Sequence, residues 1–141
     1  MFNRANPLVF LLILPFQVWA AYNIENAYPE PELKPNDVVR LQLLAMQQND
    51  DSDFGIEVTF RFASPSNKIQ TGPLKRFIRL VRNPSYRPLL NHTNATFLEL
   101  TVEGDFAVQE VVITTSNGER IGYRFRLSVQ KGPVYPGCWM T

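Results

Sequence analysis

Few side chains in this sequence are suited to catalysis, and their spacing forms no recognised catalytic motif. The single histidine, His92, lies in a polar stretch, and the single cysteine, Cys138, lies much further along the chain. A Ser-His-Asp or Cys-His arrangement would require the fold to bring Cys138 or a serine alongside His92. The residues around His92 give no sign of such an arrangement, so we predict no catalytic residue.

Metal and cofactor chemistry has as little support. Asp50, Asp51 and Asp53 lie close together and could bind a hard cation, but they lack the glycine and the distal glutamate of a calcium loop. Capping of the following helix is the simpler interpretation of these aspartates. The sequence contains no HExxH, no CxxC pair, no phosphate loop and no GxGxxG. We therefore predict no metal site and no cofactor.

The charge of the chain argues against nucleic acid as a partner, because the formal net charge is only +1. The charges are unevenly distributed, however, since no Asp or Glu occurs between Arg61 and Leu98. Within this basic stretch Lys68, Arg79 and Arg82 could form a rim that binds an anion. A solvated helix face is the alternative interpretation of the same residues.

The first twenty residues have the features of a signal peptide. Arg4 supplies the positive charge, Leu8–Leu14 is wholly apolar, and Val18 and Ala20 are small residues at the positions that a signal peptidase recognises. We expect cleavage after Ala20 and export to the periplasm or the medium. The apolar run is far shorter than the roughly 20 residues that span a bilayer, so no stable membrane anchor is expected.

After this segment we predict one domain, residues 36–141, preceded by a tether. Residues 21–35 are rich in proline and glutamate, which favours an extended conformation. The first helix is predicted to begin at Asn36 or Asp37, either of which can cap free N–H groups, and to continue to about Asn49.

A second helix is predicted from Pro73 to Asn83, where apolar residues recur at helical spacing with basic residues between them. The flanking segments, 64–72 and 84–91, are rich in turn residues. We expect Tyr86 and the side-chain amides of Asn67 and Asn91 to be buried there and hydrogen-bonded to backbone, so that they hold the helix in place.

The segment from Asp53 to Ala63 has two interpretations. Ile56, Val58 and Phe60 alternate with polar residues, which favours a strand. The apolar residues also recur four apart, which fits a helix buried on two sides. By the sequence pattern alone we favour the strand, with the helix as the alternative.

The second half of the chain predicts an antiparallel sheet of about four strands. Alternating segments occur at 96–102, 106–115 and from Arg120 onward, and Asn117-Gly118 favours a hairpin turn. A fourth, short strand from Cys138 to Thr141 would bury Cys138 as a small apolar residue. Helices followed by such a meander indicate an α+β domain with N-terminal helices packed on the sheet.

Five short motifs occur in the same order as in a known family. They are FASPSNK (62–68), TGPLKRF (71–77), VRNPSYRPLLNH (81–92), FAVQEV (106–111) and GCWMT (137–141). With these motifs the chain resembles the uncharacterised family called domain of unknown function 4864. The resemblance implies a fold similar to nuclear transport factor two, in which a curved sheet wraps around helices to form a cone with a pocket. In that fold residues 53–63 are helical, and we adopt this interpretation. The family implies no activity and assigns no functional residue.

Two functional hypotheses remain. In the first, the protein is an exported, non-catalytic module that binds a small apolar ligand or a partner protein in or around the cone. The aromatic residues predicted to form its walls are Phe60, Tyr123, Phe125 and Trp139. In the second, the protein is a small enzyme that uses a carboxylate or tyrosine in the cone for acid/base chemistry. The core face of the sheet offers almost no acid, so we favour binding.

The resemblance also makes a homodimer a candidate assembly, because cone folds commonly pair through the outer face of the sheet. That face would display Arg124 and Arg126. Like charges repel across a two-fold axis unless acidic residues such as Glu99 or Glu110 pair with them.

Overall fold

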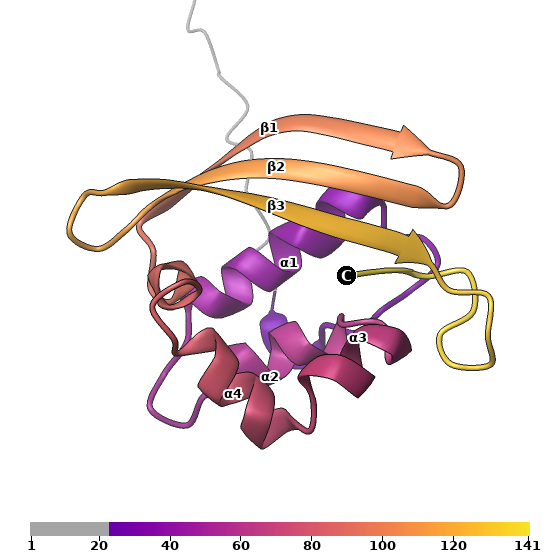
Figure 1. The fold of residues 1–141 in the computed structure, drawn as a ribbon, viewed down its shortest axis with the longest axis horizontal. Helices are drawn as coiled ribbons and strands as arrows, with labels where there is room; N and C mark the ends of the chain where they lie inside the picture. Colours follow the sequence, from indigo (N-terminus) through magenta and orange to yellow (C-terminus); the bar gives the residue numbers. More distant parts are fainter. Residues whose placement is uncertain (1–22) are drawn as a thin grey trace, which may run out of the picture.

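The computed structural model describes residues 23–141, which form α-helices followed by a four-stranded antiparallel sheet (Figure 1). The helical elements are η1 (Ile24–Asn26), α1 (Pro35–Gln47), α2 (Phe54–Arg61), α3 (Pro65–Thr71), α4 (Leu74–Val81) and η2 (Arg87–Leu89). The strands are β1 (Asn94–Glu103), β2 (Phe106–Thr114), β3 (Arg120–Val129) and β4 (Trp139–Met140). The α+β class is therefore confirmed. The predicted signal peptide lies outside the described residues.

The first helix, α1, begins at Pro35, slightly earlier than predicted. A proline is favourable there because the N–H it lacks would have no partner in the first turn. The carboxylate of Asp37 then accepts a hydrogen bond from the backbone N–H of Lys34, at 2.9 Å. This contact satisfies a backbone donor at the start of the helix and fixes its first residue.

The segment 53–63, whose pattern was ambiguous, contains a helix, which confirms the interpretation that we adopted. In α2, Ile56 and Val58 are fully buried, and Phe62 directly after the helix is buried as well. A Cβ atom added at Gly55 would lie only 2.0 Å from the backbone oxygen of Ala45, so α1 and α2 touch through their backbones. The alternation of apolar residues was misleading because both sides of this helix are covered.

The turn-rich segment 64–72 contains a helix, α3, that the sequence analysis did not predict. The Ser64 hydroxyl accepts a hydrogen bond from the N–H of Asn67, at 3.2 Å, and Pro65 occupies the first helical position. No residue of α3 is buried. The segment therefore carries no apolar periodicity from which a helix could be recognised.

Helix α4 occurs where it was predicted, but it spans Leu74–Val81 rather than Pro73–Asn83. The packing of its flanking segments was predicted only in part. The Asn67 side chain donates to the carbonyl of Thr141, and that of Asn91 donates to the carbonyl of Asn49. These hydrogen bonds to backbone are as expected. The predicted burial is wrong for Tyr86, which is 43% exposed in its proline-rich turn, and for Asn91, which is also exposed, whereas Asn67 is half-buried.

The sheet has the order β1-β2-β3-β4, with every neighbouring pair antiparallel. Strand β4 pairs only with Ser128 and Val129 at the end of β3. On β2, the residues Ala107, Gln109, Val111 and Ile113 are buried and define the inner face of the sheet. Glu110 lies between them on the outer face, where its carboxylate binds the guanidinium of Arg124 at 2.7 Å.

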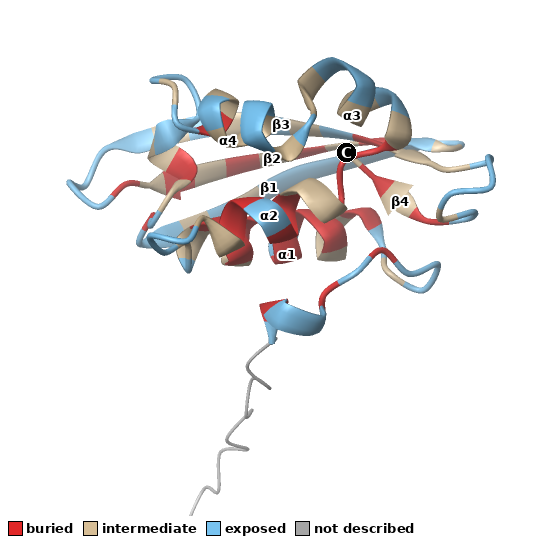
Figure 2. Ribbon diagram, turned by 90° about the horizontal axis from the view of Figure 1, so that it is seen from below, coloured by how far each residue is buried: buried red, intermediate tan, exposed pale blue. Residues whose placement is uncertain are grey.

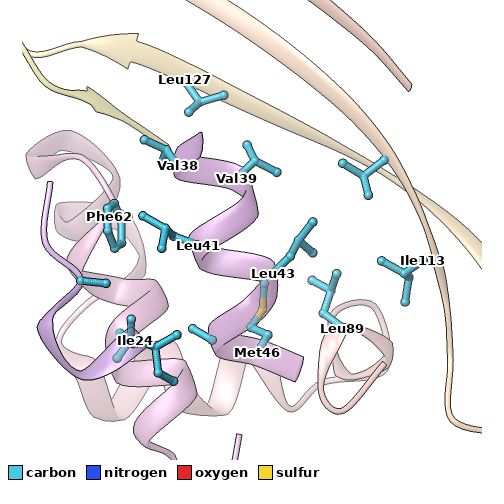
Figure 3. Close-up of a cluster of buried hydrophobic side chains, with 14 of the residues drawn as sticks. Ile24, Val38, Val39, Leu41, Leu43, Met46, Phe62, Leu89, Ile113 and Leu127 are labelled. Carbon is cyan, nitrogen blue, oxygen red and sulfur yellow. The ribbon is translucent and has the colours of Figure 1, made fainter. Parts of the chain in front are cut away.

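The core lies between α1 and the inner face of the sheet (Figure 3). Figure 2 shows that buried residues concentrate in α1, α2 and the strands above α1, whereas α3 and α4 are mostly exposed or intermediate. Ile24 and Ala27 also belong to this core. The segment predicted as an extended tether is thus packed on the domain from residue 24, because the apolar side chains of Ile24, Ala27 and Leu33 find partners there.

Among residues 23–141, none of the helices has the length and apolar character that a membrane crossing requires.

Candidate functional site

A cavity of about 260 Å³ lies between the helices and the inner face of β3. It exists because α4 packs mainly on α2, which itself packs on α1, so that α4 is not pressed against the sheet (Figure 1). The cavity is lined by Gln42, Met46, Thr59, Asn67, Thr71, Phe77, Leu80, Val81, Tyr86, Leu89, Tyr123, Arg124, Phe125, Arg126 and Thr141.

Aromatic rings form two of the cavity walls. Tyr123 and Phe125 are on the inner face of β3, since they alternate with Arg124, which binds Glu110 on the outer face. Across the cavity, α4 contributes Phe77. The Tyr123 hydroxyl donates a hydrogen bond to the backbone oxygen of Ser85 at 2.9 Å, which joins β3 to the segment after α4. Burial, with a smaller contribution from Tyr86, raises the pKa of Tyr123.

Gln42 of α1 is a buried amide beside the cavity that is only partly hydrogen-bonded. The residue is 3% exposed. Its Nε2 donates to the backbone oxygen of Thr59 at 3.2 Å and to the hydroxyl of Thr141 at 2.9 Å. The Thr141 hydroxyl can donate in turn to the backbone oxygen of Phe62, at 3.3 Å. The Oε1 atom of Gln42 has no hydrogen-bond partner among the described residues.

Two other polar side chains of the cavity, Thr71 and Asn67, are already engaged. Thr71 donates to the backbone oxygen of Asn67 at 2.9 Å, and Asn67 donates to the backbone oxygen of Thr141 at 3.2 Å. None of the described residues that line the cavity is an aspartate or a glutamate. The cavity therefore offers shape and apolar surface rather than an acid/base pair.

Two of the four predicted wall residues line the cavity. They are Tyr123 and Phe125. Phe60 lies behind the wall, with its ring centroid 4.9 Å from that of Phe77. Trp139 packs against the hydrophobic core from β4. Whether any of these residues binds a ligand stays a prediction.

The structure does not gather the predicted anion rim into one cluster. The Lys68 ammonium donates to the backbone oxygen of Arg61, at the end of α2, and burial lowers its pKa. Arg82 instead pairs with Asp53, just before the start of α2. These two partners, Arg61 and Asp53, are about 12 Å apart along the helix, and Arg79 is exposed on α4. Anion binding by these residues stays a prediction.

The two most reactive side chain types of the sequence, the histidine and the cysteine, lie far apart in the fold. His92 is buried before β1, with Nδ1 2.7 Å from the backbone oxygen of Leu89. Cys138 is buried beside the end of β3, and burial, with smaller contributions from Glu32 and Glu30, raises the pKa of its thiol. By the register of the strands they lie at opposite ends of the sheet, roughly 30 Å apart.

The aspartates near α2 have structural partners. Asp50 accepts hydrogen bonds from the N–H and the hydroxyl of Ser52. The hydrogen bond from the Ser52 hydroxyl, with a smaller contribution from the Ser52 N–H, lowers the pKa of Asp50. Asp53 pairs with Arg82. Over residues 23–141 no three His, Cys, Asp or Glu side chains converge as metal ligands would.

Gln42 and Thr141 were not anticipated from the sequence. The one available signal was a polar residue at position 42 on the apolar side of a helix, four residues after Val38. Its partners Thr59 and Thr141 come from distant parts of the chain, which no local pattern reveals.

Comparison with known proteins identifies the family. No curated protein and no solved structure matches the chain, so a nuclear transport factor two-like cone stays a prediction. One family model matches residues 30–135, which include the whole of α1 to β3 and most of the cavity lining. The chain therefore belongs to the family described as "Domain of unknown function (DUF4864)".

Proposed function

We propose that the protein is a non-catalytic binding module that holds a small, largely apolar ligand in the cavity between α4 and β3. The observation that carries this proposal is the cavity itself, whose walls are mainly aromatic and aliphatic. Small-molecule sites are typically concave and apolar, with a few polar groups that fix orientation. The cavity measures about 260 Å³, slightly below the roughly 300–1,000 Å³ typical of ligand pockets, so it suits a small ligand.

Blocking the cavity tests this proposal. Leu80 lines it from α4, so Leu80→Trp should fill it and abolish ligand binding. Ile69→Trp provides a matched control, because Ile69 is 82% exposed on α3 and does not line the cavity. Native mass spectrometry of each protein purified from its own host would reveal the bound ligand. A ligand retained equally by Leu80→Trp, or no ligand on the parent protein, would contradict binding in this cavity.

We further propose that the protein acts after export. The support is the basic residue and apolar run at the start of the chain, followed by small residues at positions 18 and 20. Sequencing the N-terminus of protein recovered from the exported fraction should give Ala21. Recovery of the full chain with Met1 from membranes would contradict export.

A further inference from the structure

Three cations on the outer side of α4 are not used by the fold. Lys75, Arg76 and Arg79 are exposed, and among residues 23–141 none of them forms an ion pair. The other side of the same helix carries Phe77 and Leu80, which line the cavity. We call Lys75, Arg76 and Arg79 the α4 cations. Their charges remain available to a partner outside the molecule.

The surrounding sequence has no acidic residue that offsets these charges. It contains no Asp or Glu between residues 61 and 98. Asp53 already pairs with Arg82, and Glu57 of α2 pairs with Arg61. Of the 14 Lys and Arg residues one precedes the described part of the chain, which leaves 13 against 13 Asp and Glu. The domain is therefore neutral as a whole but basic on one side, so an anionic surface would attract it with α4 foremost.

The neighbouring helix, α3, adds an exposed apolar side chain. Ile69 is 82% exposed, more than any other large apolar residue that the structure describes. Helix α3 contacts α4 and lies beside it in both views (Figure 1, Figure 2), and Ile69 is two residues from the end of α3. Proteins that bind lipid surfaces typically combine cations, which attract anionic headgroups, with apolar side chains that enter the interface.

The shape of this surface favours a lipid bilayer over a single anion or an acidic protein. Lys75 and Arg76 project about 100° apart around the helix, so they do not converge on one small anion. A protein partner would need an apolar centre in its interface, and Ile69 is the one exposed large apolar residue of the described helices α3 and α4. The headgroups of a bilayer can meet each cation separately. We therefore propose that the protein docks reversibly on anionic lipid bilayers through the α4 cations, with Ile69 entering the interface.

Co-sedimentation with lipid vesicles tests this proposal. The parent protein should bind vesicles made of equal parts of phosphatidylglycerol and phosphatidylcholine, and it should not bind vesicles of phosphatidylcholine alone. Each Lys or Arg near an anionic surface contributes about fivefold to the affinity, so Lys75→Gln/Arg79→Gln should weaken binding about 25-fold. Raising the salt concentration from about 50 mM to about 500 mM should release the parent protein, because the charges are then screened.

A matched double variant removes the same charge from another face. Arg120 and Arg126 are exposed and alternate with inward-facing residues of β3, so they lie on the outer face of the sheet. Arg120→Gln/Arg126→Gln should bind within about twofold of the parent. Ile69→Ser should weaken binding about 5–10-fold and leave the salt dependence unchanged, because it removes an apolar contact only. The replaced side chains are all exposed, so each variant should unfold at nearly the temperature of the parent.

Equal binding of the parent to the anionic and the neutral vesicles, or an equal loss in the two double variants, would overturn docking through α4. Unchanged binding of Ile69→Ser would overturn the part assigned to Ile69. Tighter binding of the parent to poly-L-glutamate than to the anionic vesicles would indicate an acidic protein partner and overturn the lipid surface. Docking does not require an occupied cavity, so each of these failures leaves the proposed ligand binding untouched.

Discussion

The two halves of the helical layer are packed in opposite ways. Between α1 and α2 there is no spare space, since Gly55 lies against the backbone of Ala45 and the surrounding side chains are fully buried. Between α4 and β3 there is a cavity, and Val81 is the one buried residue of α4. The tight packing of α1 on α2 stabilises the domain. This stability allows the cavity between α4 and β3 to stay open.

The sequences of the two helices explain this difference. Helix α2 is apolar on two sides, so it can be enclosed by α1 and α4 at once. Helix α4 has one apolar face and several basic residues on the others. Such a helix has to leave its basic side in solvent, and it covers the cavity without filling it.

The largest expected loss of stability comes from replacing a phenylalanine, and we compare one phenylalanine from each region. Phe62→Ala should lower the free energy of unfolding by about 3–5 kcal/mol, because the ring is fully buried. Phe77→Ala should cost only about 1–2 kcal/mol, because its ring already faces open space. Urea unfolding of both variants measures the difference. Equal losses would mean that α4 is packed as tightly as α2.

Two glycines test the close approach of α1 and α2. Gly55→Ala should destabilise the protein by about 2–3 kcal/mol, because the new Cβ atom would lie 2.0 Å from the Ala45 oxygen. Gly122→Ala is the control, since an added Cβ atom on β3 would meet nothing within 4 Å. Its stability should stay within about 0.5 kcal/mol of the parent. Thermal unfolding that separated the two variants by less than a few degrees would argue against backbone contact.

The contact across the cavity should contribute less. Tyr123→Phe removes the hydrogen bond to Ser85 and should cost about 1 kcal/mol near neutral pH. Because the pKa of Tyr123 is raised above its ordinary value of 10.0, the folded protein retains this proton after the unfolded chain has lost it. The stability of the parent should therefore fall as the pH rises above 10, and that of the variant should fall less. Denaturant unfolding at pH 8 and pH 11 measures this loss of stability. An equal loss in the parent and in Tyr123→Phe would show that Tyr123 is not its cause.

The smallest effect concerns two arginines of the basic face. Arg82→Ala should lower stability by about 0.5 kcal/mol, because it leaves Asp53 without its ionic partner. Arg79→Ala should change stability by less than that, since Arg79 is exposed. Raising the salt concentration should reduce the difference. A larger loss for Arg79→Ala would indicate a contact of Arg79 that the fold does not suggest.

The sequence was sufficient for elements whose buried residues recur with a clear period. These include α1, α4, β2 and β3, each of which places its apolar residues on one face. It was insufficient for α3, which buries nothing, and for residues 23–34, where proline and glutamate hid the burial of Ile24 and Ala27. For α2 the pattern was ambiguous, and the family resemblance decided correctly.

The candidate site was predictable to the extent that it follows from strand alternation. Tyr123 and Phe125 had to share a face of β3, and they do line the cavity. The contact between Gln42 and Thr141 joins residues 99 positions apart and depends on how α1, α2 and the chain beyond β4 pack together. Lys68 and Arg82 are separated by their partners at the two ends of α2, and Arg79 is exposed on α4.

The hydrogen bond between Tyr123 and Ser85 has a consequence for the residence time of the ligand proposed for the cavity. It is one partly exposed contact, so at about 1 kcal/mol it would be broken in roughly one molecule in six at any moment. Side-chain rotation at such a position takes picoseconds to nanoseconds. Exchange of a bound ligand with solvent would then be limited by how fast it leaves the aromatic walls, and differences in affinity between ligands would appear mainly in their dissociation rates.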